Sequence, residues 1–298
     1  MGFARRSDRL NRRSHQGNAT RTGSFSIDTS ATTDGAYGVP MATATAPDGS
    51  SIHFDVHGDG PTVLLVHGIT EQSGCWAPIV ERLATDHRVV TMDLRGHGRS
   101  DRTAPYDLAT MVGDVAAVIA AAGGGEVDLI GHSLGGAVVS AAAGALPVRS
   151  VVNVDQSLQL DAFQEQLQAA APMLRDPETF PAVIGALFDD MAGTALSEEE
   201  RARIESFRAA EQDVVLGVWH DVIESDPADL RALVEATAAA ISAPYLNVFG
   251  IDPGDDYADW FAAAVPSART EVWAGLGHYP HLVEPDRFVA TARSFWGR

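Results

Sequence analysis

The chain has 298 residues, of which 45% are hydrophobic, and it carries a formal net charge of −19 with a single cysteine. That length and apolar content suit one large globular domain. The acidic balance disfavours binding to nucleic acid or to an anionic membrane surface, and a lone cysteine excludes an intrachain disulfide. The sequence contains no apolar run of the roughly 18 residues that a membrane span needs, so we expect a cytoplasmic protein that acts on a small molecule.

Residues 1–40 differ in composition from the rest of the chain. They are rich in Arg, Ser, Thr, Asn and Gly and show no hydrophobic period, which predicts a disordered N-terminal tail. Paired arginines occur there, but no apolar segment follows them, so twin-arginine export is not expected. We therefore expect the folded domain to cover residues 41–298.

The folded part alternates strand and helix patterns. Residues 51–56 alternate apolar and polar side chains like an antiparallel edge strand, and residues 62–68 form the continuous apolar run of a central strand. Further strand patterns lie at 88–93, 127–130, 150–155, 244–250 and 269–274, and helical patterns at 75–84, 107–122, 256–264, from Leu134 and from Pro285. This order predicts an α/β fold with a mostly parallel sheet and helices on both faces.

The alternation is interrupted once. Residues 156 to about 242 contain helical patterns and no strand pattern. A helical stretch of this length inside a β/α series predicts an inserted helical lid.

The segment Gly-His-Ser-Leu-Gly at 131–135 fits the G-x-S-x-G nucleophile elbow, with a strand pattern before it and a helix pattern after it. Ser133 is therefore the predicted nucleophile. A serine hydroxyl is weakly nucleophilic and needs an adjacent base. His278, on the loop between the last strand and the last helix, is the predicted base, whereas His281 is interpreted as structural.

An acyl-transfer site also needs backbone N–H groups for the developing oxyanion. The residue after the nucleophile, Leu134, supplies one. The loop after the strand at 62–68 supplies the other, at Ile69.

Four segments together resemble the α/β-hydrolase superfamily over about residues 42–298: LLVHG at 64–68, MDLRGHGRSD at 92–101, GHSLGG at 131–136 and GLGHYPHLVEP at 275–285. The resemblance implies an eight-stranded sheet and a serine-type catalytic triad. Haloalkane dehalogenases and epoxide hydrolases of the same fold place Asp at the elbow, so Ser133 argues against both activities.

The acid of the triad is left open, chiefly between two aspartates, with Asp255, Asp256 or neither as the remaining alternatives. In the family it usually follows the seventh strand, three residues beyond a glycine, but here Pro253 has that position and Asp252 comes one residue early. Some relatives carry the acid at the end of the preceding strand, where this chain has Asp155.

We therefore expect hydrolysis of a carboxylic ester or lactone of a small, largely apolar molecule through an acyl-serine intermediate. Neither a metal nor an organic cofactor is expected, because no His, Asp and Cys cluster has the spacing of metal ligands. Two alternatives remain: a C–C bond hydrolase or cofactor-free perhydrolase with the same triad, and a non-catalytic small-molecule receptor on the same fold.

Overall fold

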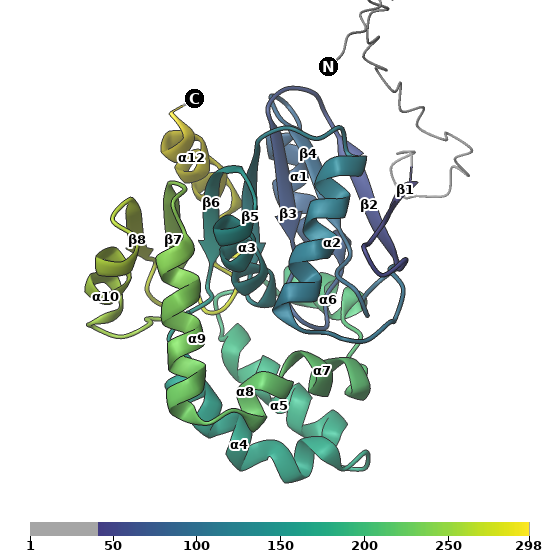
Figure 1. The fold of residues 1–298 in the computed structure, drawn as a ribbon, viewed down its shortest axis with the longest axis vertical. Helices are drawn as coiled ribbons and strands as arrows, with labels where there is room; N and C mark the ends of the chain where they lie inside the picture. Colours follow the sequence, from purple (N-terminus) through teal and green to yellow (C-terminus); the bar gives the residue numbers. More distant parts are fainter. Residues whose placement is uncertain (1–40, 298) are drawn as a thin grey trace, which may run out of the picture. The chain divides into compact units, whose positions relative to one another are not determined.

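The computed structural model describes residues 41–297, and the tail predicted at 1–40 lies outside these residues (Figure 1). The described chain forms one eight-stranded sheet with the strand order β1-β2-β4-β3-β5-β6-β7-β8. The strands are β1 (Met41–Thr45), β2 (Ser51–His57), β3 (Thr62–Val66), β4 (Arg88–Met92), β5 (Val127–His132), β6 (Val148–Val154), β7 (Tyr245–Phe249) and β8 (Ala268–Val272).

Strands β3 to β8 run parallel to one another, whereas β2 pairs antiparallel with β4 and β1 pairs antiparallel with β2. The eight-stranded, mostly parallel sheet confirms the predicted α/β-hydrolase fold. One detail of the prediction was wrong: β2 is not an edge strand, because β1 pairs along its whole length from Met41 opposite Asp55 to Thr45 opposite Ser51. The alternating pattern of β2 reflects one partly exposed face of the sheet. Such a face is found on the second strand of a sheet as well as on its edge strand.

Helices cover both faces of the sheet (Figure 1). One face packs against α2 (Leu108–Ala121), α3 (Leu134–Ala145) and α10 (Tyr257–Ala264). The other packs against η1 (Ser73–Trp76), α1 (Ala77–Leu83), α11 (Pro280–Val283) and α12 (Pro285–Trp296). The central strands are buried on both sides, which explains their continuous apolar runs.

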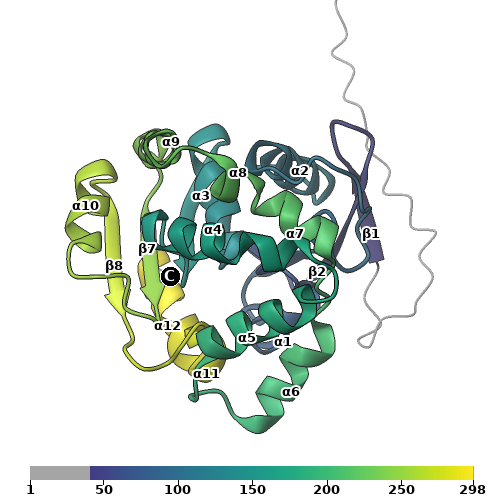
Figure 2. The same ribbon diagram turned by 90° about the horizontal axis from the view of Figure 1, so that it is seen from below.

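Six helices lie between β6 and β7: α4 (Asp161–Arg175), α5 (Phe180–Ala192), α6 (Glu198–Phe207), α7 (Gln212–Val218), α8 (His220–Glu224) and α9 (Pro227–Ala240). Figures 1 and 2 show α4, α5, α7 and α8 grouped beyond one end of the sheet, which we call the lid. The lid has its own apolar core, which includes Leu167, Phe188 and Trp219 and packs on Ile69 of the sheet domain.

A local sequence signal sets the start of α6. The Ser197 hydroxyl accepts a hydrogen bond from the Glu200 N–H (3.1 Å) and caps α6, whose first turn carries three glutamates. Helix α9 returns from the lid to the sheet domain, where it packs on α3. None of the helices within residues 41–297 is both long and apolar enough to cross a bilayer.

Candidate active site

Ser133 occupies the sharp turn between β5 and α3, with φ 51° and ψ −123°. Positive φ strains a residue that carries a side chain, by about 1–3 kcal/mol. The turn is possible because its neighbours lack a Cβ atom: one at Gly131 would lie 2.1 Å from the Gly135 carbonyl oxygen, and one at Gly135 would lie 2.1 Å from the Val66 oxygen. A hydrogen bond from the Ser133 N–H to the Val154 carbonyl (3.0 Å) holds the strained residue against β6.

His278 lies on the loop after β8 and forms a buried pair with Asp155 at the end of β6. Its Nδ1 is 2.6 Å from Asp155 Oδ2, and the two residues are only 6% and 7% exposed. An ionised carboxylate can only accept, so Nδ1 carries the proton and Nε2 has the free lone pair in the neutral ring. Nε2 is buried and has no hydrogen-bond partner within residues 41–297.

The Asp155 carboxylate is fixed by the neighbouring strand. Its Oδ1 accepts hydrogen bonds from the N–H groups of Gly250 (2.7 Å) and Ile251 (2.9 Å), which follow β7. Asp155 also has a positive φ, of 53°, and its N–H bonds to the Val248 carbonyl (2.9 Å). These backbone N–H groups therefore hold the carboxylate in the orientation in which it binds the imidazole.

The structure does not bring Asp252 to His278. Asp252 is exposed at the rim of the cavity that Ser133 lines, and its carboxylate accepts a hydrogen bond from the Gly254 N–H (3.0 Å) in its own loop. Of the two aspartates that the sequence leaves open, Asp155 is the one in contact with the imidazole.

The two backbone N–H groups predicted for the oxyanion belong to the loop after β3 and the start of α3. Leu134 is the first residue of α3, where backbone N–H groups have no partner within the helix. Among residues 41–297, neither the Leu134 N–H nor the Ile69 N–H donates a hydrogen bond to another residue. Ile69 lines the same cavity as Ser133 and His278. Both N–H groups thus have no acceptor within the described residues, and their role at an oxyanion stays a prediction.

A second buried carboxylate lies behind this site, and sequence analysis missed it. Glu71 Oε2 accepts from the Gly68 N–H (3.1 Å) and lies 3.3 Å from His132 Nδ1, while Oε1 accepts from the Tyr279 hydroxyl (2.8 Å). His132 Nε2 in turn donates to the carbonyl of His278 (2.9 Å). Glu71 therefore connects the oxyanion loop, the nucleophile elbow and the loop that carries the base.

Both nitrogens of His132 face acceptors, the Glu71 carboxylate and the His278 carbonyl, an arrangement that favours an imidazolium paired with a carboxylate. Burial opposes charge on both groups, but the charge of His132 and its hydrogen bond outweigh burial and lower the pKa of Glu71. Burial likewise disfavours the His132 cation, yet the Glu71 charge and hydrogen bond raise the pKa of His132 above its ordinary value. No signal in the sequence reveals this pair, because a glutamate in a polar loop is ordinarily solvated.

The cavity beside Ser133 is small, about 270 Å³, and its walls are mostly apolar. The lid contributes Phe163, Phe188, Met191 and Trp219, and the sheet domain contributes Ile69. Trp219 packs edge-on against Phe163, with ring centroids 5.8 Å apart. Residues 41–297 contain no group of three or more His, Cys, Asp or Glu side chains placed to hold a metal ion.

Comparison with known proteins agrees with this architecture. Residues 63–291 match the model of the alpha/beta hydrolase family. The chain is 32% identical over 157 residues to 2-(acetamidomethylene)succinate hydrolase of Mesorhizobium japonicum, a match that covers 50% of this chain and 55% of that protein. The chain therefore spans about half the length of such a curated relative.

Two solved structures are similar over most of the chain. The esterase RhEst1 from Rhodococcus sp. has 27% sequence identity and a TM-score of 0.65, with 86% of this chain and 98% of that chain covered. Est816, described as an N-acyl homoserine lactone degrading enzyme, has 25% identity and a TM-score of 0.69, with 85% and 100% covered.

Proposed function

Because the chain belongs to the alpha/beta hydrolase family, we propose that it is a serine hydrolase. We propose further that it cleaves a carboxylic ester or lactone of a small, largely apolar molecule through an acyl-serine intermediate. The observation that carries the proposal is the orientation of His278: Nδ1 is bound to Asp155, and the unpartnered Nε2 belongs to a ring that lines the same cavity as Ser133.

In the first half of the reaction, His278 Nε2 takes the proton of the Ser133 hydroxyl as its oxygen attacks the substrate carbonyl carbon. The N–H groups of Ile69 and Leu134 donate to the oxyanion that forms. When the carbonyl reforms, the C–O bond to the alcohol breaks, and the His278 imidazolium protonates the leaving oxygen. Asp155 stabilises the imidazolium and keeps the ring in its working tautomer.

In the second half, His278 takes a proton from water, and the resulting hydroxide attacks the acyl-serine. Collapse of this second tetrahedral intermediate releases the carboxylic acid and returns the proton to Ser133. The apolar cavity favours an uncharged group next to the carbonyl, because a charged group would lose its hydration there without gaining a partner. The esterase and the lactone-degrading enzyme of similar fold support this reaction class.

A fluorophosphonate probe tests the nucleophile directly. We expect the probe to label the protein at Ser133 and to fail with Ser133→Ala. The matched control is Ser157→Ala, which removes another hydroxyl that lines the same cavity and should leave labelling unchanged. Equal labelling of wild type and Ser133→Ala, or none of the wild type, would show that Ser133 is not an activated nucleophile.

A substrate panel then tests the reaction class. Nitrophenyl esters and lactones should be turned over by the wild type and by Ser157→Ala, but not by Ser133→Ala. Turnover of vinylogous diketones without turnover of esters would assign the site to C–C bond hydrolysis instead.

A further inference from the structure

A second, larger cavity lies between the sheet domain and the helices α7, α8 and α9. Its volume is about 1030 Å³, compared with about 270 Å³ for the cavity beside Ser133. Its walls come from α2 and α3 on one side and from α7, α8 and α9 on the other, and they include Val112, Ala141, Leu216, Val222 and Leu233. The smaller cavity falls just below the range of about 300–1,000 Å³ typical of ligand sites, and the larger one lies just above it.

The walls of the larger cavity are apolar and offer no positive charge from arginine. Aliphatic side chains dominate the lining, and the carboxylates among the lining residues belong to Asp107 and Asp221. Leu108 and Leu233 line this cavity and are 36% and 52% exposed, so their apolar surface is open to a ligand. An uncharged aliphatic group would find contacts in this cavity, whereas a carboxylate would meet two like charges, with His220 as the one lining side chain that can carry a positive charge.

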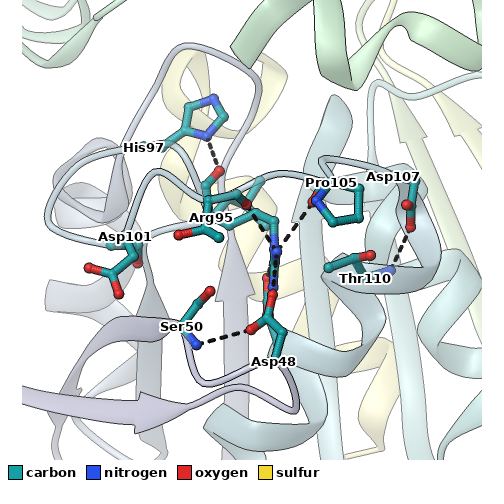
Figure 3. Close-up of polar contacts among 12 residues, drawn as sticks. Asp48, Ser50, Arg95, His97, Asp101, Pro105, Asp107 and Thr110 are labelled. Atoms are coloured by element: carbon teal, nitrogen blue, oxygen red, sulfur yellow. Dashed lines mark hydrogen bonds and ion pairs between the residues drawn. The ribbon is translucent and has the colours of Figure 1, made fainter. Parts of the chain in front are cut away.

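One wall of the larger cavity is fixed before any ligand binds. Arg95 is fully buried and forms a two-point ion pair with Asp114 (2.6 and 2.7 Å). Its Nη1 donates to the carbonyl oxygens of Thr103 (3.1 Å) and Pro105 (3.2 Å) and to Asp48 (3.0 Å). Figure 3 shows the Arg95 side chain with its contacts to Pro105 and Asp48.

The same wall is held at its other end by a helix cap. The Asp107 carboxylate accepts a hydrogen bond from the Thr110 N–H (2.8 Å), as Figure 3 also shows. The segment from Ala104 to Asp107 lines the cavity and is therefore anchored by Arg95 and by this cap. A preformed wall loses little conformational freedom when a ligand binds.

The two cavities share lining residues in the segment that follows Asp155. Gln156 and Leu160 line both of them. A chain attached to a carbonyl at Ser133 would outgrow the 270 Å³ cavity and could continue past these two residues. We propose that the larger cavity binds the uncharged aliphatic chain of the ester or lactone whose carbonyl lies at Ser133, an inference that rests on the proposed function.

Chain length is the first test. Each methylene buried in the cavity should raise kcat/KM about fourfold, so we expect a steep rise along p-nitrophenyl esters from acetate to decanoate or along alkyl acetates from ethyl to decyl. Matched esters that end in a carboxylate should not show the rise.

Ala141→Phe fills the cavity from α3, eight residues after Ser133. We expect it to abolish the rise with chain length, lowering kcat/KM for the longest ester at least tenfold, and to leave the acetate within about twofold. The control is Ala236→Phe, the same substitution at an exposed position of α9 outside the cavity lining, which should preserve the rise.

Binding without turnover is the second test, and it does not depend on the folding of Ala141→Phe. Ser133→Ala should bind the neutral fluorophore N-phenyl-1-naphthylamine, and 1-decanol should displace it at lower concentration than decanoate does. One outcome would overturn the inference and leave the proposed function intact. In that outcome the acetate is hydrolysed, kcat/KM does not rise with chain length, and the fluorophore does not bind.

Two other outcomes are decisive. Absence of Ser133 labelling and of any ester turnover would overturn the proposed function, and the inference with it. A wild-type dimer in sedimentation that Leu233→Arg dissociates, together with a flat chain-length profile, would assign the apolar walls to a second copy of this chain and overturn the inference alone.

Discussion

Two buried carboxylate–histidine pairs lie side by side in this molecule, with the rings of His132 and His278 4.6 Å apart. In both, Nδ1 faces a carboxylate, from Glu71 or from Asp155. They differ at the other nitrogen: Nε2 of His132 is bonded to the His278 carbonyl, whereas Nε2 of His278 has no partner within residues 41–297. A histidine whose two nitrogens are both engaged can hold a structure together, and one with a free nitrogen beside a cavity can transfer a proton.

Ser133→Ala should have the largest effect, because it removes the group that His278 serves and touches nothing in the Glu71–His132 pair. We expect kcat to fall by about 10⁴-fold or more, with the melting temperature nearly unchanged, as measured by steady-state turnover and circular dichroism. Retention of even a tenth of wild-type activity on every substrate would contradict the assignment of the nucleophile.

Asp155→Asn should separate the two aspartates that the sequence leaves open. The amide favours the wrong imidazole tautomer, so kcat should fall by about 10⁴-fold, while Asp252→Asn should stay within a few-fold. Both variants are compared by kcat at equal folded fraction. Equal and mild losses from the two substitutions would mean that neither carboxylate orients His278.

Glu71→Gln should act on stability, because it leaves the His132 cation buried without its counter-ion. We expect the free energy of unfolding to drop by about 3–5 kcal/mol, measured by urea denaturation. The matched variant Tyr279→Phe removes the hydrogen bond to Glu71 and the one from Arg208 but no charge, so it should cost only about 1–2 kcal/mol. A Glu71→Gln protein as stable as Tyr279→Phe would show that the pair is not ionised.

The stability contribution of this pair should depend on pH with a defined sign. Because the pKa of Glu71 is lowered, this group stabilises the folded state fully above its ordinary pKa of 4.5, and that stabilisation is lost as the pH falls. Because the pKa of His132 is raised, this group stabilises the folded state fully below its ordinary pKa of 6.5. That stabilisation is lost as the pH rises through the pKa of the folded state. The difference in unfolding free energy between wild type and Glu71→Gln should therefore be larger at pH 5.5 than at pH 9, and a difference that does not change with pH would contradict the raised pKa.

Trp219→Ala should have the smallest effect, because the lid residue lines the cavity without taking part in proton transfer. We expect the ratio of kcat/KM between large and small acyl groups to change about tenfold, while the rate of labelling by a small fluorophosphonate changes less. A uniform loss on all substrates and on the phosphonate would identify Trp219 as a packing residue.

The fold class and the elbow could be predicted because their signals are local. The alternation of apolar runs with helical patterns specifies a parallel sheet. The sharp turn from strand to helix at Ser133 requires Gly131 and Gly135, because a Cβ atom at either position would collide with the backbone. The position of His278 could also be predicted, because the loop after the last parallel strand starts at the same sheet edge as the elbow.

The sequence by itself determined the strand and helix order, the strained turn at Ser133 and the loop that carries His278, because each depends on neighbouring residues. Tertiary structure alone decided what lies between distant segments. Asp155 meets His278 because β6 and β7 are neighbours and the Gly250 and Ile251 N–H groups fix the carboxylate. The burial of Glu71, and the large cavity between α3 and α9, likewise depend on segments that are far apart in the chain and adjacent only in the fold.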